Sequence, residues 1–379
     1  MRSFYDSIFF NVPPLRFPEF NGEWEKCTIK DYGEVVTGNT PPTSNSEYYD
    51  NGSYLWASPA DLGISKNITE TKTKLSLSGF RKTRNIPKGS VLITCIGSTI
   101  GKMGMATETM SSNQQINSIV INDKSDSDFV YYAISRAFPR YLSEVGIQAV
   151  PILSKSNFEK LPNYTTCREE QDKIGYFLNL LDERIATQNK IIDKLQSLIK
   201  GIRVCCMQRV YGNNVHLSEI AQIYQPQTIS STELTEDGFL VYGANGIIGK
   251  YKDYNHETEQ ICITCRGNTC GMVNYTKPMS WITGNAMVIN TDKYQDKVCK
   301  RYLYHYLSGY NFNSIISGSG QPQIVRTPLE KLKITLPTIS EQKQKAMILD
   351  KNQDKIDISH KILNLYIRQK QHLLRQMFI

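Results

Sequence analysis

The sequence predicts an α+β fold in which two similar globular domains are joined by two long helices that form an antiparallel coiled coil with pseudo-twofold symmetry. Three observations lead to this prediction: an internal repeat, short β-branched runs in each copy of the repeat, and a long heptad-patterned segment after each copy. A chain of 379 residues is also too long for one compact core, which favours several domains.

The internal repeat consists of four landmarks that recur in the same order. The stretch "ITCIGSTIG" at 93–101 returns as "ITCRGNTCG" at 263–271, a shift of 170. The other landmarks are Asn117-x-x-Val120-x-Asn122, which returns as Asn285-x-x-Val288-x-Asn290 with a shift of 168, and "EKL" at 159–161 and "EQ" at 170–171, which both return with a shift of 171. Chance does not supply four ordered matches, so we take the chain as a duplicated unit.

The first part of each copy is expected to form strands, turns and few helices. Runs such as 90–94 and 116–121 are rich in β-branched residues and are bounded by Gly, Asn and Ser. Helices are expected at Ser127 to Tyr141 and at Tyr294 to Ser308. We therefore predict globular domains over 1–166 and 212–338, and long helices over 167–211 and 339–379.

The segment from Arg168 to Tyr211 contains no proline, and its apolar residues follow a seven-residue repeat with Gln188 as the polar exception. Such a helix would measure roughly 66 Å and could act as a ruler. The expected seam residues are Ile174, Leu178, Leu181, Ile185, Ile192, Leu195, Ile199, Ile202 and Cys206.

The closing segment repeats this pattern more weakly, since Asn352, Ser359 and Lys370 interrupt it. Two imperfect seams can cover each other, and a pseudo-twofold relation would make the helices antiparallel. The alternative is that each helix packs on its own domain. The residues that fit the second seam are Leu349, Ile356, Leu363, Tyr366, Leu373 and Met377.

Composition places few limits on function. The net charge of +8 is compatible with a polyanionic partner but does not require one. The sequence lacks a long apolar run and a signal-peptide layout, so we expect a cytoplasmic protein without a membrane partner. Nine scattered cysteines fit a reducing compartment better than a disulfide framework.

Cys262, Cys265 and Cys270 lie close together in sequence and resemble a metal site. Side chains alternate faces along a strand, so Cys262 and Cys265 should point to opposite sides. In the other copy Leu92 stands at the place of Cys262, and Ile100 at the place of Cys270. We therefore expect small buried hydrophobic residues and no metal ligands.

A polar, glycine-containing loop follows the repeated strand, at 97–102 in one copy and 266–271 in the other. Glycine lets a backbone approach a partner closely, and Ser, Thr, Asn, Lys and Arg can contact phosphates or base edges. The spacing is not that of an ATP-binding loop. A plain tight turn, or an exposed solvated loop, remains the alternative. The candidate DNA-binding residues are Arg81, Lys82, Arg84, Ser98, Thr99, Lys102, Asn113, Gln114, Gln115, Gln148, Asn245, Lys250, Arg266, Asn268, Thr269, Gln321, Gln323 and Arg326.

No residue set indicates catalysis. Asp61 with 70–72 mimics a nuclease cluster, but the second copy has no counterpart. The five histidines share no spacing that suggests a triad or a ligand set. No catalytic residue is therefore assigned.

Several stretches resemble specificity subunits of type I restriction-modification systems. They are "VPPLRFPEFNGEWEKCTIKDYGEVVTGNTPP" at 12–42, "YLWASPADLG" at 54–63, "REEQDKIGYFLNLLDERI" at 168–185 and "SEQKQKAMILDKNQDKI" at 340–356. The resemblance spans nearly the whole chain. The second copy departs from it because it lacks a match to "YLWASPADLG", and its final helix has an interrupted seam.

The resemblance implies a non-catalytic subunit whose two target recognition domains each read half of a bipartite double-stranded DNA sequence. It also implies helices that dock methyltransferase subunits, a separate restriction and motor subunit, and S-adenosylmethionine, ATP and Mg²⁺ on those partners, with no cofactor on this chain. A self-sufficient DNA-modifying enzyme, or a duplicated scaffold without a nucleic-acid role, is the alternative. The candidate partner-binding residues are Gln171, Leu178, Leu181, Ile185, Ile192, Leu195, Gln342, Leu349, Ile356 and Leu363.

Overall fold

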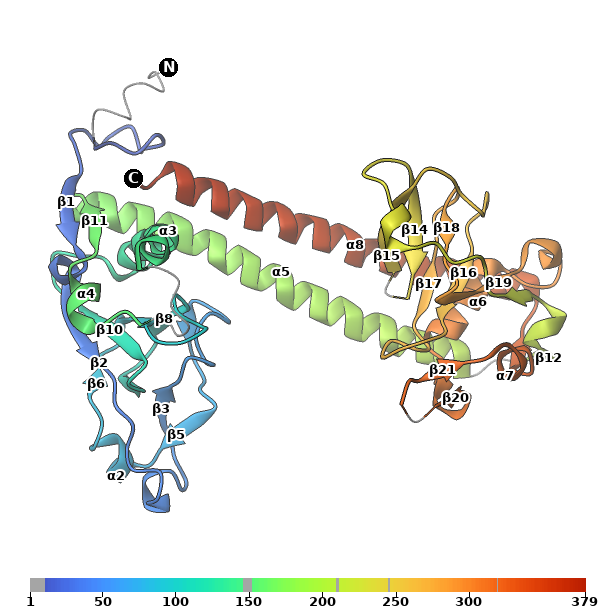
Figure 1. Ribbon diagram of the computed structural model, residues 1–379, viewed down its shortest axis with the longest axis horizontal. Helices are drawn as coiled ribbons and strands as arrows, with labels where there is room; N and C mark the ends of the chain where they lie inside the picture. Colours follow the sequence, from blue (N-terminus) through green and yellow to red (C-terminus); the bar gives the residue numbers. More distant parts are fainter. Residues whose placement is uncertain (1–10, 146–151, 209–210, 245, 319) are drawn as a thin grey trace. The chain divides into compact units, whose positions relative to one another are not determined.

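The computed structural model describes residues 11–145, 152–208, 211–244, 246–318 and 320–379. The chain separates into two compact units. The first unit comprises 1–187 and 363–379, and the second comprises 188–362. Each unit contains one globular domain and one segment from each of two long helices, α5 (Arg168–Gln208) and α8 (Ile339–Gln376), which Figure 1 shows in green and red.

The globular domain of the first unit is built on three sheets. A five-stranded sheet has the order β2 (Gly33–Thr37), β10 (Ile116–Ile121), β7 (Val91–Thr94), β8 (Met103–Ala106) and β4 (Asn67–Ile68). A four-stranded sheet has the order β5 (Thr73–Leu75), β3 (Tyr54–Ala57), β9 (Met110–Ser112) and β6 (Asn85–Ile86), and β1 (Glu25–Thr28) pairs with β11 (Pro162–Thr165). The helices are α2 (Leu77–Phe80), α3 (Ser127–Val145) and α4 (Lys155–Glu159).

The second unit repeats this topology. Its central sheet has the order β13 (Gln222–Tyr224), β19 (Ala286–Asn290), β16 (Ile261–Thr264) and β17 (Val273–Tyr275), which matches β2, β10, β7 and β8. Strands β15 (Gly246–Tyr251), β14 (Phe239–Gly243) and β18 (Trp281–Ile282) form a second sheet, β12 (Asn213–His216) pairs with β22 (Lys333–Leu336), and β20 (Ile316–Ser317) pairs with β21 (Gln323–Ile324). The helices are α6 (Lys300–Ser308) and α7 (Arg326–Glu330). The predicted duplication and α+β class are confirmed.

Strand register corrects one of the repeat landmarks. Asn117 pairs with Ile93, whereas the repeat of Ile93, which is Ile263, pairs with Met287. The counterpart of Asn117 is therefore Met287, with the same shift of 170 as the rest of the sheet, and the match to Asn285 at a shift of 168 was wrong. The true counterpart of Asn285 is Gln115, because these residues accept hydrogen bonds from the equivalent amides of Cys265 and Cys95.

The second unit does have a counterpart of "YLWASPADLG". Ala57 at the end of β3 accepts a backbone hydrogen bond from Asn113, and Tyr242 in β14 accepts the equivalent bond from Thr283, both at 2.9 Å. Both strands also pair in parallel with the next equivalent strand, β9 or β18. The second copy lacks the residues of this stretch, as the sequence shows, but it keeps the topology of the stretch.

The long helices begin at a buried glutamine clamp in each unit. The side-chain oxygen of Gln171 accepts a hydrogen bond from the backbone nitrogen of Asp126 at 3.0 Å, and that of Gln342 accepts one from Cys299 at 2.8 Å. The side-chain nitrogen of Gln171 donates to the carbonyls of Lys124 and Thr166, and that of Gln342 donates to the carbonyls of Lys297 and Pro337. The "EQ" landmark therefore ties each long helix to the start of the neighbouring shorter helix.

The predicted seam is confirmed within each unit. In the first unit Ile174, Leu178 and Leu181 of α5 pack in one core with Leu373 and Met377 of α8. In the second unit Ile192 and Ile199 of α5 and Leu349 and Ile356 of α8 are buried. Lys370, which interrupts the heptad pattern, pairs with Asp182 at 2.5 Å, so this interruption in one helix is met by a charge in the other.

Two helix predictions needed adjustment. The helix expected from Tyr294 begins at Lys300, because residues 292–294 form a 3₁₀ turn instead. The helix expected to end at Tyr211 is described as far as Gln208, and Tyr211 lies outside it.

Candidate nucleic-acid interface

The two repeated loops, 97–102 and 266–271, have the same backbone conformation. In the first loop the amides of Ile100, Gly101 and Lys102 donate to the carbonyls of Gly97, Thr94 and Thr99, at 3.1, 2.9 and 3.1 Å. In the second loop Cys270, Gly271 and Met272 donate to Gly267, Thr264 and Thr269, at 2.9, 2.9 and 3.0 Å. The loops are thus one hydrogen-bonded double turn built twice, with different side chains on it.

Glycine is required at two positions of each loop. Gly97 and Gly267 have φ angles of +95° and +87°, and Gly101 and Gly271 have +88° and +91°, a region that other residues rarely adopt. The last glycine also lies against an aromatic ring, since a Cβ on Gly101 would stand 2.8 Å from the ring of Phe138. Phe312 takes the equivalent place beside Gly271. An aromatic side chain from outside the loop therefore packs against each loop, from α3 in the first unit and from the 3₁₀ turn Phe312–Ser314 in the second.

The first unit brings its predicted polar stretches together beside the loop. Asn39 donates to the carbonyl of Lys82 and accepts from the amide of Arg84, at 2.9 and 2.8 Å. Thr40 donates to the side chain of Gln114 at 2.5 Å, and the amide nitrogen of Gln115 approaches Gly97 of the loop. Asn39 and Thr40 lie within the "GNTPP" stretch and are not among the candidate residues predicted from the sequence. They nevertheless contact the candidate stretches, Asn39 at Lys82 and Arg84 and Thr40 at Gln114.

The exposed side chains on this face carry mostly positive charge or amide groups. Arg81, Lys82, Arg84, Lys102 and Gln114 are exposed, as is Ser98 at the loop tip. Thr99 and Gln115 are half-buried. Asn113 is buried, and its side chain accepts from the amide of Gln115 at 3.0 Å. Asn113 therefore shapes the turn and is not available to a ligand, which corrects its selection.

The second unit gathers a corresponding group. Arg266 forms a backbone bridge with Gln323, and Gly267 donates to the carbonyl of Pro322 at 3.0 Å, so 321–323 lies directly beside the loop. Arg266, Asn268, Gln321 and Gln323 are exposed, and Thr269 is half-buried. Asn285, the counterpart of Gln115, is also exposed here but was not selected, although the repeat offers the signal to find it.

Some selected residues lie elsewhere or are already paired. Lys250 belongs to the β14–β15 hairpin, where it pairs with Asp237 at 3.1 Å. Arg326 is exposed and pairs with Glu330 one helical turn later, at 2.7 Å. Gln148 and Asn245 lie outside the described residues.

Asp61 and its neighbours serve the fold. The carboxylate of Asp61 accepts from the amide and hydroxyl of Ser58, at 2.9 and 2.6 Å, and from the amide of Lys72 at 2.9 Å. Glu70 pairs with Lys74. These carboxylates are thus used by a turn and a surface ion pair.

The cysteines point as predicted. Cys262 packs with Tyr242 and Val288 in one cluster, whereas Cys265 packs with Leu303 and Phe312 in another, on the opposite side of the strand. Burial raises the pKa of the Cys262 thiol to about 12, which is typical of a cysteine that acts as a small hydrophobic residue. Among the described residues no group of three or more His, Cys, Asp or Glu side chains is placed to hold a metal ion.

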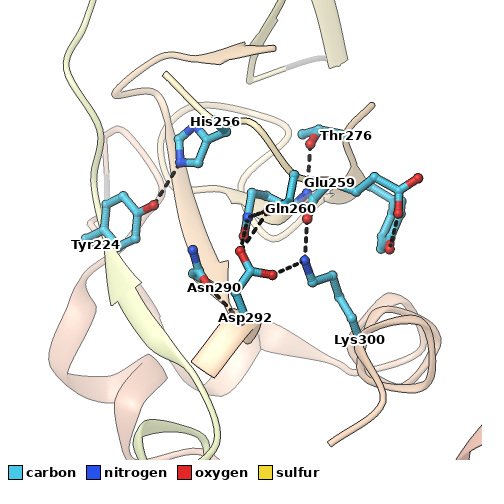
Figure 2. A network of polar contacts seen from close by, with 10 residues as sticks. Tyr224, His256, Glu259, Gln260, Thr276, Asn290, Asp292 and Lys300 are labelled. Atoms are coloured by element: carbon cyan, nitrogen blue, oxygen red, sulfur yellow. Dashed lines mark hydrogen bonds and ion pairs between the residues drawn. The ribbon is translucent and has the colours of Figure 1, made fainter. Parts of the chain in front are cut away.

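A polar network supports the sheet of the second unit. Figure 2 shows Asp292 between Gln260 and Lys300, at 2.9 and 2.5 Å, and His256 beside the hydroxyl of Tyr224, at 2.8 Å. Burial raises the pKa of Asp292, but hydrogen bonds, chiefly from Lys300, outweigh it and leave that pKa below its ordinary value. The network ties the ends of β16 and β19 to α6.

Two of the five histidines, His256 and His305, contact polar side chains of other elements. His256 contacts Tyr224, and His305 bonds to Asp350 at 2.6 Å. Both contacts lie within the fold of the second unit and join its elements, and neither forms a triad with a nucleophile among the described residues.

Comparison with known proteins identifies the family. The domain described as the type I restriction modification DNA specificity domain matches the chain twice, at residues 21–197 and 213–365. The chain belongs to this family.

Relatives in this specificity family match the chain at low sequence identity. The specificity subunit of type I restriction enzyme HindI from Haemophilus influenzae is 28% identical over 186 residues, which are 46% of this chain and 40% of that protein. The chain thus spans less than half the length of that relative. The EcoprrI specificity subunit from Escherichia coli is 23% identical over 361 residues, 87% of each protein.

A solved specificity subunit from M. genitalium has the same fold. Its crystal structure matches 97% of this chain and 99% of its own, with a TM-score of 0.69 and 18% sequence identity. No helix in the described part of this specificity chain is long and apolar enough to cross a membrane.

The candidate partner-binding residues of this family member face inward. Seven of the ten, namely Gln171, Leu178, Leu181, Ile192, Gln342, Leu349 and Ile356, are buried inside their own unit, and Ile185, Leu195 and Leu363 are half-buried. The seven buried side chains are occupied by the seam and the clamps, and the binding of a partner by the ten residues stays a prediction. The large apolar side chains left exposed on the two long helices are Tyr176, Phe177, Leu180, Ile191, Leu198, Val204, Met347, Ile348, Ile358, Leu365 and Ile367.

Proposed function

We propose that the chain is the non-catalytic DNA-binding subunit of a type I restriction-modification complex, and that each unit reads one half of a bipartite target. The observation that supports this most is the double turn built twice on the same backbone bonds with different side chains. A fixed backbone with exchanged side chains is what two readers of different sequences require.

The loop chemistry suits base and phosphate contacts. The first loop offers Ser98 and Lys102, and the second offers Arg266 and Asn268, all of them exposed. Arginine and lysine can bind the O6 and N7 atoms of guanine, and asparagine can bind adenine at two points. Because the side chains differ, the two units should prefer different half-sites.

The helices are proposed to dock methyltransferase subunits through their outer faces. Exposed apolar residues such as Leu198 on α5 and Ile358 on α8 are unusual on a solvated helix and suit a protein partner. Methyl transfer with S-adenosylmethionine is assigned to those subunits, and ATP- and Mg²⁺-dependent cleavage to a separate restriction and motor subunit.

The test exchanges the first domain, residues 20–161, for that of a relative with a known target. Binding to duplexes with either half-site altered should show that one half-site changes and the other stays. If both half-sites change together, the modular function is contradicted. The purified chain alone should also show neither methyl transfer nor nuclease activity, whereas activity would favour a self-sufficient enzyme.

A further inference from the structure

Each unit contains a partly buried arginine whose Nε atom has no hydrogen-bond partner among the described residues. These residues are Arg136 on α3 in the first unit and Arg203 on α5 in the second. Leaving a buried charged donor unsatisfied costs stability. Because the feature occurs once per unit, it calls for a functional explanation.

The two arginines occupy equivalent places although different helices supply them. The glutamine clamps align Asp126 with Cys299, so the same offset along α3 and α6 aligns Arg136 with Gly309. A Cβ on Gly309 would stand 2.8 Å from the Cδ atom of Arg203, so the side chain of Arg203 fills the place that Arg136 would take. A guanidinium thus lies at the equivalent place in both units, but α3 supplies it in the first unit and α5 supplies it in the second.

The equivalent positions of the two long helices show the same exchange. Gln171 on α5 corresponds to Gln342 on α8, and the same offset aligns Arg203 with Leu374. The first unit therefore has an arginine on its short helix and a leucine on its long helix. The second unit instead has a glycine, Gly309, at the end of its short helix and an arginine, Arg203, on its long helix.

In the second unit Arg203 lines a cavity of about 710 Å³ between α5, α8 and the end of α6. Its Nη1 atom donates only a long hydrogen bond, at 3.5 Å, to the carbonyl of Ser308. A cavity of this size can take several side chains of a partner. The cavity also offers an apolar wall, a second positive charge, one carboxylate and an imidazole, supplied by Ile199, Met207, Ile356, Lys200, Asp357 and His360.

In the first unit Arg136 lies beside two further arginines. Burial lowers the pKa of Arg136, and the charges of Arg140 and Arg375 lower it further. Arg140 donates a hydrogen bond to the main-chain oxygen of Ile379 at 3.1 Å. In both places positive side chains outnumber negative ones, and a guanidinium there suits a carboxylate, which can bind an arginine through two hydrogen bonds.

We propose that Arg136 and Arg203 are equivalent anchors for a carboxylate-bearing segment of two copies of one partner, the methyltransferase subunit. The proposal rests on the proposed function and adds the anchoring residues and their contact chemistry. One partner surface can use both places because each presents a guanidinium at the junction of a long helix with α3 or α6.

The test titrates the purified cognate methyltransferase subunit into the full chain, with calorimetry for affinity and native mass spectrometry for the number of copies bound. The wild type should bind two copies. Arg136→Met or Arg203→Met should weaken one of them by at least about 30-fold, and the double variant should weaken both. Arg168→Met is the matched control, because that exposed arginine of α5 is already paired with Asp172, and it should bind like the wild type.

Unchanged unfolding temperature and unchanged DNA binding show that each variant is folded. If both single variants bind two copies with wild-type affinity, the anchors are refuted while the proposed function stands. If the wild-type chain binds no methyltransferase subunit, the proposed function fails, and the anchors with it.

Discussion

The side chain of Gln188 on α5 donates a hydrogen bond to the backbone carbonyl of Ser359 on α8, at 3.2 Å, inside the seam of the second unit. Both residues interrupt a heptad pattern, and both are buried. A single polar pair in an apolar seam fixes the register of two helices at some cost in stability. The two irregular positions of the sequence are therefore one structural feature.

Replacing Gln188 with leucine should raise the free energy of unfolding by about 1 kcal/mol, because an apolar side chain then fills the seam. Denaturant unfolding followed by circular dichroism measures it. Asn189→Leu, at the exposed neighbouring position, should change little. A loss of more than about 1 kcal/mol in Gln188→Leu would show that the hydrogen bond outweighs the packing.

Alanine substitutions at the loop glycines should separate the cost of backbone strain from the cost of a steric clash of the new Cβ. Gly101→Ala should cost about 2 kcal/mol or more, because both the φ of +88° and the ring of Phe138 oppose a Cβ. Gly271→Ala should cost about 1 kcal/mol, since its nearest atom would be 3.4 Å away. Gly201→Ala, in open space on α5, should stabilise by up to about 1 kcal/mol. Equal effects at all three glycines would contradict the loop geometry.

Removing one charge from either loop should affect one half-site only. Lys102→Ala and Arg266→Ala should each weaken binding to duplex DNA, and the slope of log affinity against log salt should fall by about 1 if the lost contact is to phosphate. Competition with duplexes altered in one half-site shows which half is affected. Lys343→Ala, an exposed charge on α8, is the control. Identical half-site profiles for both loop variants would argue against two separate readers.

Acid should weaken the contact between α6 and α8. Asp350 accepts from Arg301 and His305, each at 2.6 Å. Burial raises the pKa of Asp350, but these hydrogen bonds outweigh it and hold the pKa below its ordinary value of 3.8. Because the folded state binds this proton less tightly than the unfolded state, the stabilisation is complete above that value and is lost as the pH falls below it.

Asp350→Asn should therefore cost about 1–3 kcal/mol at neutral pH, and its difference from the wild type should shrink as the pH falls below about 4. Unfolding at a series of pH values measures this difference. Asp354→Asn, an exposed position on the same helix, should show neither effect. A difference that stays constant down to acid pH would assign the loss to packing alone.

Much of the architecture follows from the sequence because repeats and heptads are periodic signals. The constant shift between 93–101 and 263–271 located the two loops, and the heptads located the buried positions of α5 and α8. The counterpart of β3 has no signal in the sequence, because β14 keeps the pairing of Ala57 through Tyr242 without a shared residue pattern. Backbone hydrogen bonds carry this equivalence, and they leave no trace in residue identity.

The site was harder to predict than the fold. Polarity alone does not distinguish a residue that faces solvent from one that shapes a turn, so Asn113 was selected and Asn39 was not. Likewise Gln171 and Gln342 stood out in the repeat because they are essential to the fold, and both side chains are buried in the clamps. The exchange of Arg136 for Arg203 across helices has no sequence signal at all.

The most direct test of two readers held in one chain is a map of modified bases in host DNA, with and without this chain. The account predicts that methylation depends on the chain and falls on a two-part motif, with a stretch of unspecified base pairs between its halves. A single continuous motif, or a methylation pattern that persists when the chain is removed, would contradict it.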